Sequence, residues 1–400
     1  MAYKYIMYRN KRYNTSRSIL SASGILDVSP NVTGSTINGV PNITEFAIPG
    51  NVTKIESGAF SGNKYIRYVK IPNSVTSIDR ELFYMCTSLT NIDIPDSVTS
   101  IGSSAFDGCN SLTSITIPDS VTTIGSYAFK NCTGLTSIII PDSVTFIDTY
   151  SFYGCSNLQY IYEYYLLATS GKTFLCKQVP SSITEFTIRD DCICIGGNAF
   201  AHCTALTSIN IPDSVTSIGS SVFGYCTNLT DVTIGNGLTN IGGWAFQNCT
   251  ALTSIDIPNS VTYIGSRAFY KCTSLTSITI PDSVTFIDGA AFMDCHSLAD
   301  VTIGNGLTTI EYSTFYSCTG LTDINIPNSV TSIGRYAFED CTSLTIITIP
   351  KSVTSIGNGA FYNCAALTDI YYSGTQEEWN AITIGSNNEP LTNATIHYNS

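Results

Sequence analysis

Histidine and charged residues are scarce in this chain. Only three histidines stand among 400 residues, and 12% of the residues are charged, with 18 Lys and Arg against 30 Asp and Glu. The net charge of -12 argues against nucleic-acid binding, which needs a basic face to displace counterions from phosphates. The sequence contains no run of eighteen apolar residues, so we expect no insertion into a membrane.

The residue patterns of an enzyme are also missing. The sequence has no Ser-His-Asp order, no glycine-rich phosphate loop, no H-E-x-x-H motif and no calcium loop. His202 and His296 stand in turns beside Cys203 and Cys295, four repeats apart, so they cannot act together. Hydrolytic carboxylate pairs need one acid in a desolvated pocket, whereas the recurring Asp residues stand in turns or on a strand face. We therefore expect no catalysis, no cofactor and no metal.

What the chain does contain is one 23-residue unit, repeated over most of its length. The stretch from Ser100 to Thr122, SIGSSAFDGCNSLTSITIPDSVT, returns almost unchanged in the next 23 residues. A Phe marks each unit, and the spacing is 23 except at one jump. From Cys86 onward a Cys follows three residues behind each Phe, and Asn63 takes that place in the first unit. The marking residues are Phe60, Phe83, Phe106, Phe129, Phe152, Phe200, Phe223, Phe246, Phe269, Phe292, Phe315, Phe338 and Phe361.

Each unit contains the frame L-x-x-I-x-I, which in most units is followed by Pro, as in Leu112–Pro118. Its apolar and polar residues alternate as in a half-buried strand, which the Pro ends. A 23-residue unit cannot bury its apolar side alone, but stacked copies share one core and pair their strands in parallel. The frame recurs fifteen times, from residue 43 to residue 367. The sequence thus predicts a right-handed leucine-rich-repeat solenoid of about fifteen units, with a parallel β-sheet on the concave face and short irregular or strand segments on the convex side.

The consensus I-P-x-S-V-T-x-I-G-x-x-A-F-x-x-C-x-x-L-T-x-I resembles the BspA-type (Treponema pallidum-like) leucine-rich repeat of bacterial and protist surface proteins. The C-terminal IYYSGTQEEWNAITIGSNNEPLTNATIHYN is similar to the closing segment of such proteins from gut Firmicutes. The resemblance covers about residues 40–400. It implies a non-enzymatic adhesin, on the cell surface or secreted, that binds host matrix proteins such as fibronectin or fibrinogen, host cells or other bacteria. The sequence itself shows no signal peptide.

Departures from the repeat predict the domain organisation. Residues 159–182 lose the Phe and Cys, and YEYYLLATSGKTFLCK predicts a β-hairpin around Ser170 and Gly171. Thr375 and Glu378 fit a capping box that opens a short helix, with Trp379 facing inward and ATIHY forming a last strand. We expect an N-terminal cap (1–39), a first repeat block (40–158), the irregular repeat (159–182), a second block (183–370) and a C-terminal cap (371–400).

Fifteen cysteines invite a disulfide or metal interpretation. The twelve periodic ones recur at one position between a buried Phe and a buried Leu, so they are predicted to be inward packing residues. Rungs about 4.8 Å apart hold Cβ atoms farther apart than a disulfide prefers. A thiolate metal site could be suggested by Cys176, Cys192, Cys194, His202 and Cys203. Aligning RDDCICIG with PDSVTSIG, however, places Cys192 inward and Cys194 outward. The alignment therefore favours sequence drift over a zinc site.

Ligand binding is expected on the concave face, at the third and fifth positions of the frame. Most residues there are Ser or Thr, so the tyrosines and acids are the informative ones. Exposed aromatic residues are common contacts at interfaces, although Tyr also suits strands for structural reasons alone. The hairpin is the best landmark for specificity. The candidate binding residues are Tyr68, Lys70, Asn91, Asp93, Tyr160, Tyr162, Glu185, Asp231, Asp256, Asp300, Asp323, Asp369 and Tyr371.

Two other functions compete with the adhesin. The first twenty residues hold five Lys and Arg with no acid, which suits a receptor-binding or decoration protein of a phage-like or other assembled particle. The structural alternative for this basic segment is a strand-forming cap whose charged side chains are solvated. Rows of Thr raise ice binding, but Asp, Asn and Ile139 interrupt the flat array that it needs. The sequence thus predicts a protein partner and leaves the oligomeric state open.

Overall fold

The computed structural model describes residues 45–48, 50–160 and 163–398. Of the chain before them it describes the backbone of five short strands, of which β1 pairs antiparallel with β2 and β4 with β5. The predicted N-terminal cap, including its basic side chains, otherwise lies outside the described residues. These strands are β1 (Tyr5–Tyr8), β2 (Lys11–Asn14), β3 (Ile25–Leu26), β4 (Thr36–Ile37) and β5 (Val40–Pro41).

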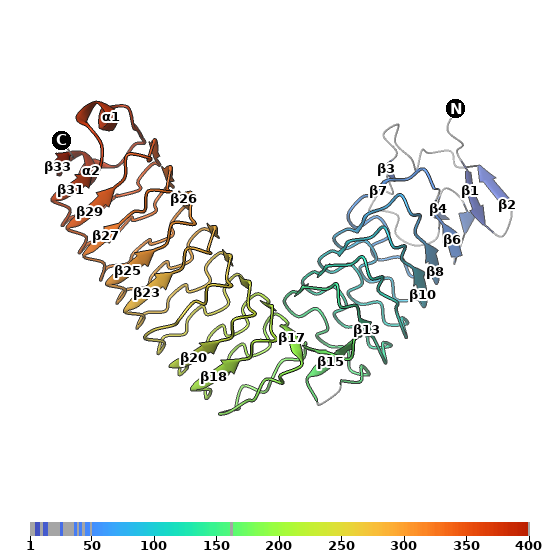
Figure 1. Cartoon of the computed structure of the whole chain (residues 1–400). Coiled ribbons are helices and arrows are strands. Elements are labelled where there is room, and N and C mark those ends of the chain that lie inside the picture. Colours follow the sequence, from blue (N-terminus) through green and yellow to red (C-terminus); the bar gives the residue numbers. More distant parts are fainter. Residues whose placement is uncertain are drawn as a thin grey trace. The chain divides into compact units, whose positions relative to one another are not determined.

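The chain divides into two compact units, each a stack of coils (Figure 1). Unit 1 comprises Met1–Lys177 and Cys194–Gly197, and unit 2 comprises Gln178–Ile193 and Asn198–Ser400. The coils follow the 23-residue period and number about 14, which confirms the predicted leucine-rich-repeat solenoid. The chain first passes from unit 1 to unit 2 inside the segment 159–182 that departs from the repeat.

The L-x-x-I-x-I frame supplies the first strand of a coil. Successive frames pair in parallel with a shift of one repeat, so that Asn91 lies opposite Tyr68 and Asp300 opposite Ser277. In unit 1 these strands are β6 (Glu45–Ala47), β8 (Tyr68–Lys70), β10 (Asn91–Asp93) and β13 (Ile139–Ile140). In unit 2 they are β18 (Ser208–Ile211), β20 (Asp231–Ile234), β23 (Ser277–Ile280), β25 (Asp300–Ile303), β27 (Asp323–Asn325), β29 (Ile346–Ile349) and β31 (Asp369–Tyr372).

The strand predicted over Leu112–Pro118 does not form as a hydrogen-bonded strand. Its side chains still alternate as predicted, because Ile115 and Ile117 are buried while Ser114 and Thr116 are exposed. Burial of the apolar residues therefore sets the direction of the side chains even where the backbone ladder is interrupted.

A second, two-residue strand follows in most coils, at the end of the S-V-T-x-I segment. Its Ile is buried and stacks on the equivalent Ile of the next coil, as Ile101 does on Ile124. In unit 1 these strands are β7 (Lys54–Ile55), β9 (Ser77–Ile78), β11 (Ser100–Ile101), β12 (Thr123–Ile124) and β14 (Phe146–Ile147). Further along come β17 (Cys192–Ile195), β19 (Ser217–Ile218), β21 (Asn240–Ile241), β22 (Tyr263–Ile264), β24 (Phe286–Ile287), β26 (Thr309–Ile310), β28 (Ser332–Ile333) and β30 (Ser355–Ile356).

The G-x-x-A-F segment turns the chain back and carries the core Phe. Adjacent Phe rings stack nearly parallel, with centroids 5.2–5.5 Å apart from Phe60 to Phe152. From Phe200 to Phe361 the centroids are 5.2–5.6 Å apart. Such ring pairs contribute about 0.5–1.5 kcal/mol beyond burial alone. The Phe column therefore joins each coil to its neighbours in the stack.

The periodic cysteines lie beside this column, and all twelve are buried thiols. Eleven of them donate a hydrogen bond from Sγ to the carbonyl oxygen of the Phe in the preceding coil, at 2.9–3.2 Å. The prediction that these cysteines face the core is confirmed. The prediction that Cys194 points outward is wrong, since its side chain is buried like that of Cys192.

The irregular repeat contains the predicted hairpin. Strands β15 (Tyr165–Ala168) and β16 (Thr173–Leu175) pair antiparallel on either side of Ser170 and Gly171. Gly171 has φ +84°, a conformation that glycine adopts without strain. β15 also pairs in parallel with β13, which attaches the hairpin to the regular coils of unit 1.

The C-terminal segment contains the predicted capping box, inward Trp379 and last strand. Helix α1 (Gln376–Asn380) opens with a capping box, in which Glu378 N donates to Thr375 Oγ1 and Thr375 N donates to Glu378 Oε2. Trp379 is buried and packs edge-on against Tyr372, with ring centroids 5.2 Å apart. Strand β32 (Thr383–Ile384), helix α2 (Glu389–Asn393) and strand β33 (Thr395–Tyr398) complete the segment. β33 pairs with β31, so it covers the edge of the last regular coil.

Candidate binding surface

The third and fifth residues of each frame form what we call the sheet face. These side chains point away from the core because strand residues alternate between the two sides. Most of the candidate binding residues on this face are exposed, while three are partly buried: Tyr68, Tyr160 and Asp369. Tyr162 lies outside the described residues. The exposed candidates are Lys70, Asn91, Asp93, Glu185, Asp231, Asp256, Asp300, Asp323 and Tyr371.

Two candidates in unit 1 are tied to each other. The Tyr68 hydroxyl donates a hydrogen bond to the Asp93 carboxylate on the adjacent strand. This bond to the carboxylate, together with partial burial, raises the pKa of Tyr68 to about 12. The pair is therefore a fixed polar contact across β8 and β10, and a ligand would meet the two side chains as one group.

Tyr160 is less available than its place in the frame predicts. Burial raises the pKa of its hydroxyl, because the phenolate would lose its hydration. The Lys177 ammonium lies 5.5 Å from the centroid of the Tyr160 ring and 5.6 Å from that of Tyr164. These cation–π distances place Tyr160 in a local cluster with the hairpin.

The sheet face of unit 2 carries one sign of charge. Six of its positions from Glu185 to Tyr371 are acidic, and none is Lys or Arg. Asp300 and Asp323 occupy the same frame position on successive coils, which stack about 4.8 Å apart. The face therefore offers hydrogen-bond acceptors and negative charge to a partner.

At the end of the face, His397 joins two of the candidates. Its Nε2 lies 2.7 Å from Asp369 Oδ1, and its ring stacks on Tyr371 with centroids 4.7 Å apart. The hydrogen bonds from His397 and from Thr368 lower the pKa of Asp369 below its usual value. His397 was not among the predicted candidates, because its partners lie 26 and 28 residues away in the sequence.

Apolar residues on the sheet face were not among the predicted candidates. Ile139 is 56% exposed and Leu167, its partner in the β13–β15 pair, is 39% exposed. Ile346, between Asp323 and Asp369, is 37% exposed. The sequence could have indicated these contacts, because Ile139 and Ile346 stand at frame positions that other repeats fill mostly with Ser, Thr or Asp.

The threonines that recur in rows form hydrogen bonds between neighbouring coils. Thr262 Oγ1 donates to the carbonyl oxygen of Thr239 in the preceding coil, and Thr285 Oγ1 donates to that of Thr262. The frame threonines repeat the pattern, as Thr276 Oγ1 does with Thr253. These hydroxyls therefore extend the backbone ladder between coils.

Within the described part of the chain, no group of three or more His, Cys, Asp or Glu is placed to hold a metal ion. His202 stacks on Tyr225, with ring centroids 4.7 Å apart, while His296 Nδ1 lies 3.0 Å from the carbonyl oxygen of Ser317. None of the helices in the described residues is long and apolar enough to cross a membrane.

A stack of 23-residue coils with a parallel sheet on one side defines a leucine-rich-repeat protein. The family model described as "BspA type Leucine rich repeat region (6 copies)" matches residues 35–159, 177–299 and 264–386. The chain therefore belongs to the BspA-type leucine-rich-repeat family.

Solved structures similar to the chain come from several bacteria. A leucine-rich-repeat protein from Bacteroides ovatus is 27% identical, and the match covers 92% of this chain and 97% of that one, with a TM-score of 0.44. A leucine-rich cell surface protein from Faecalibacterium prausnitzii is 34% identical over 86% of this chain and 91% of that one, with a TM-score of 0.40. The leucine-rich-repeat protein of T. pallidum is 25% identical over 51% and 86%, with a TM-score of 0.34. A search of curated proteins gives no match.

Proposed function

We propose that this protein is a non-enzymatic adhesin, located at the cell surface or secreted, that binds a protein partner through its sheet face. The single observation that carries the proposal is the acidic, cation-free sheet face of unit 2. Membership of the BspA-type family supports a binding scaffold. Stacked coils hold the exposed side chains in rows with fixed spacing, which suits contact at many points along an extended partner.

The charge of the face points to the chemistry of the partner. Complementary charge increases the rate of association and suppresses wrong partners. We therefore expect a basic surface on a host matrix protein, a host cell-surface protein or another bacterium's surface protein. The alternative, attachment to an assembled particle, depends on the basic N-terminal segment and stays a prediction.

The test is capture of partners from host-matrix extract and from bacterial envelope fractions on the immobilised protein. The variant Asp300→Ser/Asp323→Ser removes two charges from the sheet face, and Ser already stands at this frame position at Ser254 and Ser277. The control Asp96→Asn/Asp119→Asn removes two charges from exposed turns elsewhere.

We expect capture of a surface protein whose binding weakens as salt is added, because salt screens Coulomb attraction at an exposed surface. Its binding should fall at least about tenfold in the Asp300→Ser/Asp323→Ser variant and stay unchanged in the control. Equal capture by both variants would contradict binding through this face.

A further inference from the structure

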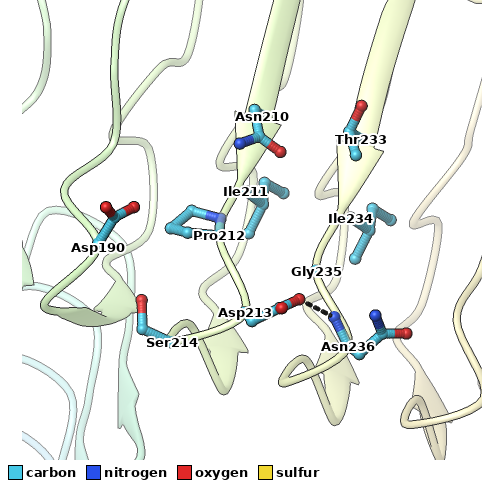
Figure 2. A pocket seen from close by; sticks show the side chains of 10 residues that line it. All are labelled: Asp190, Asn210, Ile211, Pro212, Asp213, Ser214, Thr233, Ile234, Gly235 and Asn236. Atoms are coloured by element: carbon cyan, nitrogen blue, oxygen red, sulfur yellow. Dashed lines mark hydrogen bonds between the residues drawn. The ribbon is translucent and has the colours of Figure 1, made fainter.

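A polar pocket opens in unit 2, where strands β18 and β20 end (Figure 2). Its volume is about 500 Å³, which lies within the ordinary range of small-ligand sites. Three successive coils build it: Asp190 comes from the first, the segment from Asn210 to Ser214 from the second and that from Thr233 to Asn236 from the third. Asn210 and Thr233 in its wall belong to the sheet face, but none of the six acidic sheet-face residues that carry the proposed protein binding lines the pocket.

Two departures from the repeat flank this pocket. Most coils end their first strand with Pro, as the middle coil does at Pro212. The coil before it has Arg189 at that position, and the coil after it has Gly235. A Cβ on Gly235 would lie 2.6 Å from Asp213 N, so the close approach of the two turns admits only glycine there. Pro212 therefore lies in the wall of the pocket, and the coils before and after it have no proline at the equivalent position.

The polar groups in the wall include both donors and acceptors. Asp190, Asn210, Thr233 and Asn236 are exposed, and their side chains carry carboxylate, amide and hydroxyl groups. Asp213 Oδ1 accepts a hydrogen bond from Asn236 N at 2.7 Å, which fixes the turn at the pocket's edge (Figure 2).

No Lys or Arg is among the ten residues that line the pocket. Arg189, which is next to Asp190 in the sequence, is engaged instead with Asp191, with Nη2 2.7 Å from Oδ2. The carboxylates of Asp190 and Asp213 therefore give the wall negative charge without a lining cation to offset it.

We propose that this pocket binds a neutral sugar residue of a glycan. A sugar hydroxyl both donates and accepts, so it can donate to the Asp190 carboxylate while it accepts from the amides of Asn210 and Asn236. An ammonium group would use only the acceptors, and an acidic sugar would be repelled by the two carboxylates. Pro212, whose ring is partly exposed, gives the C–H face of a sugar ring an apolar surface to contact.

The chain contains an altered copy of the same turn. The segment Ile303-Gly304-Asn305-Gly306 repeats Ile234-Gly235-Asn236-Gly237, and Asn305 N donates to Asp282 Oδ1 at 2.7 Å. At the equivalent wall positions, however, Asn259 replaces Asp190 and Thr279 replaces Asn210. The copy therefore supplies a matched control for the two side chains that would contact the sugar.

The test is binding of the intact protein to an array of neutral and sialylated oligosaccharides, followed by saturation-transfer NMR on the sugars retained. The variant Asp190→Asn/Asn210→Thr installs the residues of the second copy, so the fold should tolerate it, which circular dichroism and thermal unfolding check. The control variant Asn259→Ala/Thr279→Ala alters the equivalent positions of the second copy.

We expect a neutral oligosaccharide to bind the wild type and the control, and to bind the Asp190→Asn/Asn210→Thr variant at least about tenfold more weakly. The sheet-face variant Asp300→Ser/Asp323→Ser should keep sugar binding, which separates this site from the proposed protein surface. Retention of no neutral sugar, equal binding by the pocket variant, or binding of cationic peptides alone would overturn the proposal.

Discussion

Cys272 Sγ donates a hydrogen bond to the carbonyl oxygen of Phe246, 26 residues earlier in the chain, at 3.1 Å. The same oxygen accepts from Cys249 N at 3.2 Å, so one Phe carbonyl closes the turn of its own coil and holds the next coil. A thiol at this position therefore fills space and satisfies a buried acceptor. This relationship recurs along both stacks and leads to the first three predictions.

Replacing Cys272 by Ala should lower the free energy of unfolding by about 1–2 kcal/mol, because the buried bond is lost and a small cavity remains. Cys203→Ala is the matched control. The preceding coil offers Cys203 no Phe carbonyl, and its Sγ lies 3.7 Å from Pro180 O and 3.9 Å from Val179 O. Urea unfolding should therefore show a smaller loss for Cys203→Ala. A loss at Cys203 as large as that at Cys272 would mean that packing alone explains the effect of removing the thiol.

Alkaline pH should destabilise the protein steeply. Burial raises the pKa of Cys86, Cys155, Cys226 and Cys364 to about 12 and raises that of Cys272 well above its usual value. Below pH about 8.5, both the folded and the unfolded chain keep their thiol protons, and the full stability is present. Above it the unfolded chain releases protons that the folded chain retains, so the free energy of unfolding falls as pH rises toward the folded pKa.

Each buried thiol should contribute a slope of about 1.4 kcal/mol per pH unit in this range. Urea unfolding of the wild type and of Cys272→Ala, followed from pH 7.5 to about 10.5, isolates one thiol from the tyrosines and lysines that also titrate there. The variant should show a slope smaller by about one proton. Identical slopes would show that Cys272 ionises in the folded state.

The periodic thiols should also resist chemical labelling. All twelve are buried, and the pKa of Cys203 is raised least, to about 11, so few thiolates exist at neutral pH. With a disulfide reagent such as DTNB, we expect rapid reaction at Cys176, which is partly exposed, and reaction of the others only after unfolding. The variant Cys176→Ser should abolish the rapid phase. Several rapid equivalents in that variant would mean that the coils open on the timescale of labelling.

Gly237 should tolerate no larger residue. A Cβ there would lie 1.9 Å from the carbonyl oxygen of Asp213 in the preceding coil, so the backbone of one coil would have to move. We expect Gly237→Ala to cost at least about 2 kcal/mol in unfolding free energy, as overpacking does elsewhere. Gly50→Ala is the control, since a Cβ added at Gly50 would meet nothing within 4 Å. Thermal unfolding of the two variants should differ clearly, and an unchanged midpoint for Gly237→Ala would contradict the close approach.

The left-handed turn at Ser313 should be relieved by glycine. Ser313 has φ +53°, and its N–H donates to the carbonyl oxygen of Arg335 in the next coil at 2.9 Å. Glycine adopts this conformation without the Cβ penalty, so Ser313→Gly should be more stable than Ser313→Ala by about 0.5–1 kcal/mol. Thermal unfolding of both variants tests this, and a more stable Ala variant would contradict it.

Several features of the fold follow from the order of residues alone. A Phe every 23 residues, with Cys and Leu at fixed distances behind it, has to face the same interior in every coil, because no single coil buries its apolar side. The capping box at Thr375 and the hairpin around Gly171 were predictable for the same kind of reason, since each depends on residues close together in the chain. Asn63 also fits this logic. Its Oδ1 accepts from Tyr65 N and Ile66 N in a coil whose predecessor has no Phe at the equivalent position.

Contacts between coils decided which residues adopt left-handed backbone conformations and which predicted binding residues are accessible. Trp244 and Lys271 have φ +55° and +58°, values that their side chains do not favour, because their N–H groups donate to carbonyl oxygens of the next coil. The frame predicted that Tyr160 points to solvent, but its hydroxyl is desolvated within the coil of the hairpin. The sequence by itself therefore determined the period, the core and the row of exposed positions. Only the tertiary structure decided which of those positions are available to a ligand and where missing proline rings leave a pocket, because both depend on how neighbouring coils meet.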